Sequence, residues 1–449
     1  MRLPCRPAIT SLAAFIFFLA LARAGAQSYQ NLNVRRITLE NGLTALALED
    51  HTVPSVAYYT VFKVGSRNER PGITGLSHLF EHMMFNGSAH YKPKVFDQVV
   101  EAGGGSSNAF TTTDTTEYQT EFSSPTLPEI VKMEADRMRA LRLDQSNVEQ
   151  ERGIVKEERR VNFDNSVEGA MSEMLWNTAY IAHPYRWDPI GFMKDIDAIR
   201  LADAKAYFKT YYAPNNAVVC VVGDFDSAKL FDLIRKEYGD IPRQPSPRPV
   251  VLDEPPQNGE RRTKLYKAAE LPAVTIGYHI GTYKDPDDPA LDLLSNILGA
   301  GESSRLYRSL VYEKQIATSV SATNESRIDP GLFTFYAQAQ QGHTTEECEN
   351  AIYAALKDIQ DSGVTDRELQ KAKNIFRASY VNNFKTNMTL AGQLAEYEAN
   401  WGDWRKLFDY PKRHDRITAP DIQRVARKYF RERNRTVVTL VPEKEGEAK

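Results

Sequence analysis

The sequence predicts an α+β fold of two homologous domains, each an antiparallel sheet with helices packed on one face. The first observation is an internal repeat, in which residues 211–219 align with 429–437 and residues 53–56 align with 271–274, both at an offset of 218. The second observation is that each half runs from strands through helices to a closing strand. Short connections between recurrent strands favour antiparallel pairing.

The expected elements occupy matching places in the two halves. Strands are expected at residues 56–64, 218–222, 274–280 and 436–441, and helices at residues 128–141 and 345–359. Between the halves, a proline-rich segment is typical of a stiff, extended linker. These patterns divide the chain into a signal peptide at residues 1–26, a first domain at 27–242, a linker at 243–262 and a second domain at 263–449.

The N-terminus has the features of a secretory signal peptide. Arg2 and Arg6 precede an apolar run from Ile9 to Leu21, and the small residues 24–26 provide a cleavage site. This run is shorter than the roughly 20 residues that a membrane-spanning helix needs, and no second hydrophobic run follows. We therefore expect an exported chain that begins near Gln27 and has no membrane span. If the source is a Gram-negative bacterium, the expected compartment is the periplasm.

Composition limits the number of domains and the classes of partner that the chain can have. With 449 residues, of which 42% are hydrophobic and 26% charged, the chain has ample material for the core of two or more domains. Removing the signal peptide takes away three arginines, which leaves 53 basic and 59 acidic residues, so nucleic acid is not an expected partner. Cys220 and Cys348 are expected as buried thiols, although an oxidising compartment leaves a bridge between them open.

The most informative segment is His78-Leu79-Phe80-Glu81-His82. On a helix, this spacing places two imidazoles and a carboxylate on one face. Such a pair suits a catalytic zinc ion, which takes three protein ligands and keeps its fourth position for water, with Glu81 as the base. The order is the inverted form of a commoner zinc-protease signature. Because this spacing also arises by chance, a third ligand is needed to decide.

A third ligand is expected in the charged segment 147–160, which has helical character. Glu151 and Glu158 are seven residues apart and share a helical face, whereas Glu157 projects about 100 degrees away. We therefore predict Glu158 as the ligand and Glu151 as the partner that accepts the free N–H of a metal-bound imidazole. The alternative is an ordinary solvated helix face.

These motifs resemble the pitrilysin or insulinase family of zinc metallopeptidases, in which the third ligand follows at the interval that separates His82 from Glu158. The segments 103–111, 183–185 and 211–216 resemble the same family, and the length is similar to its half-size bacterial and mitochondrial-processing type. The resemblance implies a zinc-dependent endopeptidase that cleaves unfolded peptides or small polypeptides enclosed in a chamber. It implies one zinc ion per chain, held by His78, His82 and Glu158 beside Glu81.

Substrate binding is predicted along the Thr-rich extended segment 108–116, whose backbone could pair with a peptide as an added strand. The resemblance implies that Asn108 and Ala109 line this edge, and we add their neighbour Phe110. The alternative is an ordinary half-solvated strand. The identity of the peptide and the cleavage preference are not predicted.

The internal repeat tests the metal hypothesis. Opposite the segment 78–82, the second half carries Leu293, Asn296 and Ile297, which are not metal ligands. The fold therefore does not require the ligands, and their presence in the first half favours a catalytic role. The second domain is expected to be non-catalytic.

Two positions depart from the family pattern. The family carries an Arg and a Tyr, seven residues apart, that contact the substrate, but Val311 and Thr318 stand there in this chain. Arg305 and Tyr312 have the same spacing in another register. If the pair is absent, a related subunit is expected to supply the Arg and Tyr contacts, and this chain is the zinc-bearing subunit of a heterodimer. The non-enzymatic alternative is a scaffold or assembly subunit of the same fold.

The other histidines are not predicted as ligands. His183 is expected in a loop, because it has no helical neighbour at ligand spacing. The remaining histidines are isolated in the sequence and have no predicted role: His51, His90, His279, His343 and His414.

Overall fold

The computed structural model describes residues 32–250 and 253–443. The predicted signal peptide lies outside these residues. Within them, no helix combines the length and apolar character that a membrane-spanning segment requires. The predicted linker forms neither helix nor strand at residues 243–250 and 253–258, and the first strand of the second half begins at Arg261.

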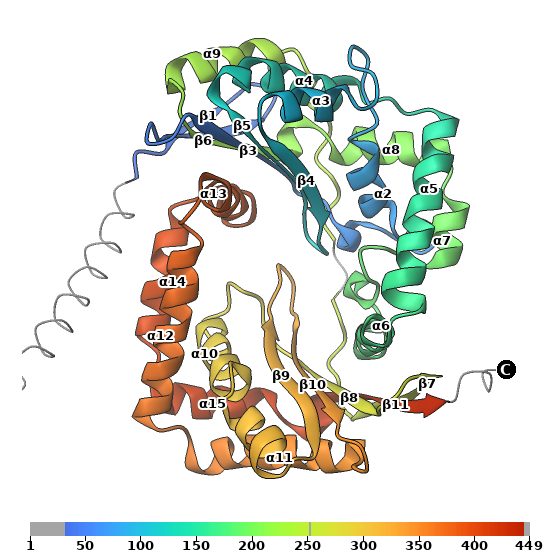
Figure 1. The fold of residues 1–449 in the computed structure, drawn as a ribbon, viewed down its shortest axis with the longest axis vertical. Coiled ribbons are helices and arrows are strands. Elements are labelled where there is room, and N and C mark those ends of the chain that lie inside the picture. Colours follow the sequence, from blue (N-terminus) through green and yellow to red (C-terminus); the bar gives the residue numbers. More distant parts are fainter. Residues whose placement is uncertain (1–31, 251–252, 444–449) are drawn as a thin grey trace, which may run out of the picture.

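The first half contains a six-stranded sheet in the order β1-β2-β6-β3-β5-β4 (Figure 1). Neighbouring strands are antiparallel except β2 and β6, which are parallel. The strands are β1 (Arg35–Thr38), β2 (Thr44–Glu49), β3 (Ser55–Phe62), β4 (Ser106–Thr111), β5 (Thr116–Ser123) and β6 (Ala217–Gly223).

The second half repeats this arrangement with five strands in the order β7-β11-β8-β10-β9, where β7 and β11 are parallel. The strands are β7 (Arg261–Ala268), β8 (Ala273–His279), β9 (Ala317–Glu325), β10 (Leu332–Ala339) and β11 (Arg435–Glu443). The predicted α+β fold with two similar halves is confirmed, but the sheets are mixed and not purely antiparallel as predicted. Each sheet is mixed because the closing strand lies between two strands of opposite direction, so it must run parallel to one of them.

The helices also occur in matching order. Those of the first half are α2 (Leu76–Met83), α3 (Val95–Ala102), α4 (Leu127–Ala140), α5 (Gln145–Arg159), α6 (Val167–Ala179), α7 (Met193–Ala198), α8 (Leu201–Tyr211) and α9 (Ser227–Tyr238). Those of the second half are α10 (Asp288–Gly299), α11 (Thr345–Ser362), α12 (Asp366–Asn382), α13 (Asn387–Trp401), α14 (Lys406–Asp415) and α15 (Ala419–Tyr429). The offset of 218 predicted from the sequence relates α8 to α15, residue for residue.

Each half packs one of its helices against the sheet of the other half (Figure 1). Helix α13 of the second half buries Leu390 and Leu394 against β3 and β6, and α6 of the first half buries Trp176 against the second sheet. Each sheet therefore has its own helices on one face, as predicted, and a helix of the other half on its second face. Burying a leucine side chain stabilises a fold by about 1.5–3 kcal/mol, so this packing joins the halves firmly.

Both remaining cysteines are free and buried, as predicted. Cys220 lies in the cluster between the first sheet and α13, and Cys348 lies in the core of the second half. The Cys348 thiol donates to the carbonyl of Ile316 at 3.4 Å. Their separate positions explain why they form no bridge.

A pair of carboxyl groups links α13 to the first sheet. Glu117 on β5 is buried and accepts hydrogen bonds from the hydroxyls of Tyr59 and Thr115, each at 2.6 Å. Its side chain is also hydrogen-bonded to that of Glu396 on α13. Two carboxyl groups that share a hydrogen bond must also share a proton, and burial and mutual repulsion raise the pKa of Glu396.

The shared proton predicts a pH dependence of stability. Because folding raises the pKa of Glu396, the stability that its protonated form contributes is complete below the ordinary pKa of 4.5 and is lost as the pH rises through the raised pKa. We expect Glu396→Gln, which keeps the hydrogen bond without the charge, to reduce the fall in stability between pH 5 and roughly pH 9. Urea unfolding at several pH values measures this effect.

Glu302 provides the control, because it is exposed and lies in a loop. Glu302→Gln should leave the pH dependence of the unfolding free energy as it is in the native chain. An equal pH dependence in Glu396→Gln and the native chain would contradict the assignment of a shared proton.

Candidate metal centre

Helices α2 and α5 bring together the three side chains predicted as metal ligands. The Nε2 atoms of His78 and His82 lie 3.6 and 3.3 Å from the same carboxylate oxygen, Oε2 of Glu158. The ligand atoms of all three residues lie within 4.8 Å of one another, and no other such cluster occurs among the described residues. Glu158, which lies 76 positions beyond His82 in the sequence, is thus brought next to the helix that carries the histidines.

The start of α2 is fixed by a glycine and a buried carboxylate. Gly75 has a φ of 89°, and a Cβ there would lie 2.4 Å from the carbonyl oxygen of Ile190, so another residue would not fit. The backbone N–H groups of Gly75 and Ser77 donate to Glu69 at 2.8 and 2.7 Å. The carboxylate thus satisfies free N–H groups at the helix N-terminus.

The apolar face of α2 decides where its histidines lie. Leu76, Leu79, Phe80 and Met83 are buried in the core of the first half. The opposite face, which carries His78 and His82, therefore meets α5. The two imidazole rings have centroids 4.9 Å apart.

Helix α5 is anchored at both ends. At its N-terminus the side chain of Asp144 accepts from the backbone N–H of Asn147 at 2.9 Å. At its C-terminus the buried Arg159 makes two hydrogen bonds to Glu173 at 2.9 Å and one to the carbonyl of Gly191 at 2.7 Å. These contacts fix the last turn, which carries Glu158.

The two adjacent glutamates of α5 separate as the helical period predicted. The side chain of Glu158 is 37% exposed and reaches the histidines, whereas that of Glu157 is 67% exposed and pairs with Arg160 on the surface. The choice of Glu158 over Glu157 therefore agrees with the geometry.

Burial sets the charge state of His78. Burial, followed by the neighbouring His82, lowers the pKa of His78 to about 3, so its imidazole is neutral near pH 7. A neutral ring nitrogen is the form that binds a metal ion. Its Nδ1 atom is buried without a hydrogen-bond partner among the described residues.

Glu151 lies behind one of the two imidazoles, as predicted, and the structure identifies that imidazole as His82. Its Oε2 is 3.5 Å from Nδ1 of His82, on the side of the ring opposite Glu158. Burial opposes the charge on His82, but Glu151 and Glu158 together raise its pKa. Hydrogen bonds from His82 and Asn86 outweigh burial and lower the pKa of Glu151. The site therefore favours a cation.

This donor set fits zinc. Two imidazole nitrogens and one carboxylate oxygen form a three-ligand set that leaves a fourth position for water. A carboxylate behind a ligating imidazole fixes the ring orientation and increases its basicity. In this chain Glu151 has the position of that carboxylate.

Glu81 lies beside the ligands and is held by a residue that the sequence did not single out. Its Oε2 accepts a hydrogen bond from the hydroxyl of Thr111 at 2.7 Å and lies 3.8 Å from Nε2 of His78. Burial raises the pKa of Glu81, although the bond from Thr111 opposes this shift. A half-buried carboxylate with a raised pKa is suited to accept a proton. Thr111 lay within the Thr-rich segment, but its long-range contact left no sequence signal.

The predicted substrate residues lie on β4, the last strand of the first sheet. Ala109 pairs with Tyr118 of β5, and within residues 32–250 and 253–443 no strand pairs with the other edge of β4. Ala109 is buried, whereas Asn108 and Phe110 are exposed. An edge strand presents free N–H and C=O groups with which an extended peptide can pair.

The second half has no comparable cluster among its described residues. Leu293 and Ile297, opposite the ligand positions, are buried in its core. Thr318 is exposed on the edge strand β9. Arg305, from the other possible register, is held by Glu368 and so is not free to contact a substrate.

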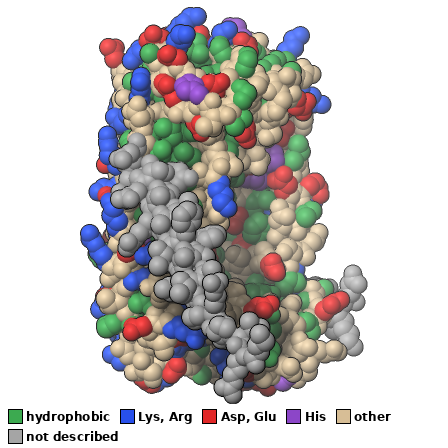
Figure 2. Space-filling view, turned by 60° about the vertical axis from the view of Figure 1, so that its left-hand side comes forward, with side chains coloured by type: hydrophobic (Ala, Val, Ile, Leu, Met, Phe, Trp, Pro, Cys, Tyr) green, Lys and Arg blue, Asp and Glu red, His purple; other side chains and the backbone are tan. Residues whose placement is uncertain are grey.

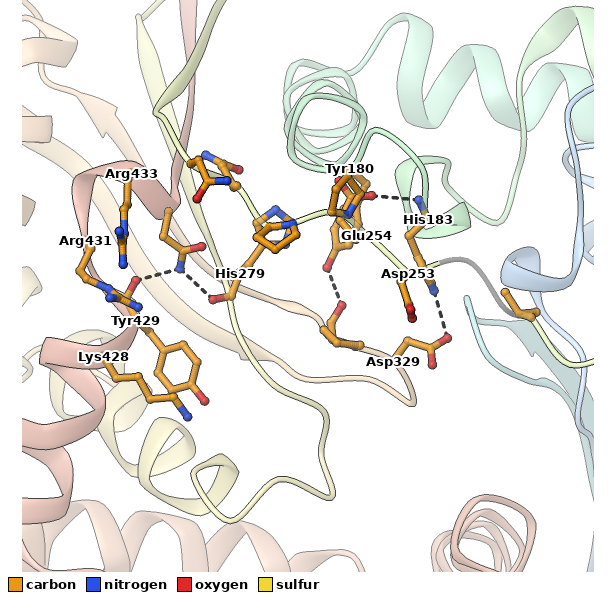
Figure 3. A pocket seen from close by; sticks show the side chains of 17 residues that line it. Tyr180, His183, Asp253, Glu254, His279, Asp329, Lys428, Tyr429, Arg431 and Arg433 are labelled. Atoms are coloured by element: carbon orange, nitrogen blue, oxygen red, sulfur yellow. Dashed lines mark hydrogen bonds and ion pairs between the residues drawn. The ribbon is translucent and has the colours of Figure 1, made fainter.

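His183 is a structural residue (Figure 3). It is buried just before the short helix Pro184–Arg186, where its Nδ1 accepts from the backbone N–H of Tyr185 at 3.1 Å. Its Nε2 lies 3.0 Å from Asp329 of the second half. His183 lines a cavity of about 520 Å³ that contains none of the predicted ligands.

Comparisons with known proteins identify the family of this chain. Residues 44–187 match the model "Insulinase (Peptidase family M16)", and residues 198–376 match the model "Peptidase M16 inactive domain". A relative from Helicobacter pylori, named "Zinc protease PqqE", is 35% identical over 422 residues, which cover 93% of this chain and 94% of the relative. The chain belongs to peptidase family M16. The resemblance seen in the sequence is confirmed.

Other M16 proteins extend the comparison. A crystal structure of a protease from Helicobacter pylori superposes with a TM-score of 0.88 at 34% identity and covers 92% of this chain and 100% of that one. A probable mitochondrial-processing peptidase subunit beta of Arabidopsis thaliana is 22% identical, over an alignment that covers 91% of this chain and 78% of that relative. The chain is therefore a half-size member of the family.

The geometry predicts how substitutions change zinc binding. We expect about one zinc ion per native chain, and loss of that ion in His78→Ala and Glu158→Ala, because each substitution removes a ligand. Glu151→Gln should weaken zinc affinity by roughly 10- to 100-fold, because it weakens the support of His82. Metal content after dialysis and competition with a chelator measure these effects.

Glu157→Ala is the matched control, because it removes a carboxylate from the adjacent position of the same helix. It should bind zinc as the native chain does. Loss of zinc in Glu157→Ala, with retention in Glu158→Ala, would contradict the ligand assignment.

Proposed function

We propose that this chain is a zinc-dependent endopeptidase that hydrolyses unfolded peptides or small polypeptides. The observation that carries the proposal is the convergence of His78, His82 and Glu158 beside Glu81. These ligands would hold a zinc ion, which would lower the pKa of its bound water from about 15.7 to about 7. Glu81 accepts the proton of this water and then delivers it to the leaving amine.

The edge of β4 is proposed to bind the peptide. Backbone pairing along Asn108, Ala109 and Phe110 orients an extended chain with little preference for its side chains. Helix α2 contacts β4, so a peptide on this edge lies beside Glu81. Figure 2 shows that the molecular surface is hollowed between the two halves, with acidic side chains along the edge of the hollow. A flexible peptide fits such a space better than a folded protein does.

We further propose that the active form contains a related subunit. Val311 and Thr318 lack the guanidinium and phenol groups that the family uses, and Arg305 is ion-paired. Loss of one group that stabilises the tetrahedral oxyanion typically costs about 10² to 10³ in rate. A partner that carries Arg and Tyr would restore these contacts. The signal-peptide pattern supports export, with a periplasmic location in a Gram-negative source.

A non-catalytic scaffold subunit is the second candidate. The match of residues 198–376 to the "Peptidase M16 inactive domain" model and the missing Arg and Tyr support it. The intact set of three ligands and a base supports the peptidase instead. Zinc bound normally without cleavage in any partnered form would favour the scaffold.

Cleavage of a mixed peptide library tests the proposed function. The native zinc-loaded chain is incubated with the peptides, with and without a related subunit that lacks the His-x-x-Glu-His segment, and the cuts are mapped by mass spectrometry. We expect cleavage with the partner, and loss of cleavage by at least about 10³-fold in Glu81→Gln at unchanged zinc content. Full activity of the chain alone would contradict the need for a partner. Unchanged activity of Glu81→Gln would contradict the role of the base.

A further inference from the structure

The catalytic base of the proposed peptidase is connected to the second half of the chain through the turn between β4 and β5. The turn begins at Thr111, the last residue of β4, whose hydroxyl donates to Oε2 of Glu81 at 2.7 Å. Thr111 pairs with Thr116, the first residue of β5. The strand that presents the peptide-binding edge therefore also contacts the base.

The turn is rigid. The backbone N–H of Thr112 donates to the carbonyl of Thr115 at 2.8 Å, and the Thr112 hydroxyl accepts from the N–H groups of Asp114 and Thr115 at 3.0 and 2.9 Å. The carbonyl of Thr113 accepts from the backbone N–H of Arg67 at 2.9 Å. With its backbone groups paired in this way, the turn can transmit a displacement from one end to the other.

Asp114 fixes the far side of the turn to the second half. Its Oδ1 accepts from the Tyr185 hydroxyl at 2.7 Å, and its Oδ2 accepts from the backbone N–H of Ile328 at 3.2 Å. The Tyr185 oxygen accepts in turn from the N–H of Asp329 at 3.0 Å. Arg67 lies 3.8 Å from Asp114 and 2.9 Å from Asp329.

These contacts are shielded from water. The side chain of Asp114 is 13% exposed and that of Arg67 is 14% exposed, and Tyr185 is buried. Ile328 and Asp329 belong to the connection between β9 and β10, which rises toward β4 in Figure 1. Buried hydrogen bonds of this kind hold their partners at fixed positions more strictly than exposed ones do.

We propose that the β4–β5 turn is a positioning element through which the second half of the chain holds the base in place. Thr111 orients the Glu81 carboxylate, and Asp114 anchors the turn that carries Thr111. Both are positioning residues, because neither contacts the zinc ligands or the scissile bond. The inference rests on the proposed function and adds a role for the half that lacks ligands.

The physical reason is the freedom of a glutamate side chain. Without the bond from Thr111, the carboxylate of Glu81 can occupy other rotamers, and a misplacement of about 1 Å can cost roughly 10²-fold in rate. The zinc ligands lie on α2 and α5 and do not depend on the turn. A defect in positioning should therefore lower kcat while zinc binding and KM stay nearly unchanged.

Thr111→Val tests the first contact in the full chain with its partner. We expect kcat for peptide cleavage to fall by about 10- to 100-fold, with KM and zinc content within about twofold of the native values. Thr111→Ser, which retains the hydroxyl, should restore most of kcat. Thr60→Val is the matched control, because Thr60 is buried in β3 of the same sheet and its hydroxyl has no partner among the described residues. Native kcat in Thr111→Val would overturn the role of Thr111.

A double-mutant cycle tests the connection to the second half. Asp114→Asn and Tyr185→Phe should each lower kcat, because each removes part of the anchor. If Asp114 acts through Thr111, Asp114→Asn should cost much less in the Thr111→Val background than in the native chain. Independent, additive losses would overturn the connection.

Two further measurements do not depend on cleavage. Hydrogen exchange of the zinc-free chain should become faster at residues 111–116 in Asp114→Asn, and a crystal structure of Thr111→Val should show the Glu81 carboxylate displaced from its native position. Unchanged exchange and an unmoved carboxylate would overturn the inference even if the native chain cleaves no peptide. A native chain that cleaves nothing, with both of these changes present, would count against the proposed function and leave the positioning element supported.

Discussion

The packing of α2 against α5 is the constraint on which the candidate centre depends. The apolar face of α2 is buried in the core, so its histidines must lie opposite α5, and Arg159 fixes the turn of α5 that carries Glu158. Burial then keeps His78 neutral, while Glu151 and Glu158 favour a cation beside His82. The same packing that builds the core of the first half therefore brings together the residues of the candidate metal centre.

The two halves have the same fold but divide its tasks. The first half carries the candidate metal ligands, and the second half has core leucine and isoleucine at the matching positions. The two halves are packed together, because α13 of the second half covers one face of the first sheet and α6 of the first half covers one face of the second sheet. The polar contacts of Asp114 and His183 with the β9–β10 connection add a second junction close to the proposed base.

Much of this arrangement was predictable from the sequence, since it depends on local periodicity. The offset of 218 identified the two halves, and the helical period selected Glu158 over Glu157 and placed Glu151 on the same face as Glu158. The structure adds that Glu151 supports His82. Contacts between distant segments leave no periodic pattern. For this reason the sequence did not predict the packing of α6 and α13 against the sheet of the other half, the parallel strand pairs, the bond from Thr111 to Glu81 or the anchoring of α2 by Glu69.

Two histidines and one glutamate from α2 and α5 are proposed to form a zinc centre. X-ray absorption at the zinc edge of the metal-loaded chain measures the ligands of the ion. Binding at this site predicts two imidazole nitrogens at about 2.0–2.1 Å with oxygen ligands at about 2.0–2.2 Å, and one imidazole fewer around any zinc that remains in His82→Ala. A sulfur ligand at about 2.3 Å, or an unchanged imidazole count in His82→Ala, would show that zinc binds elsewhere.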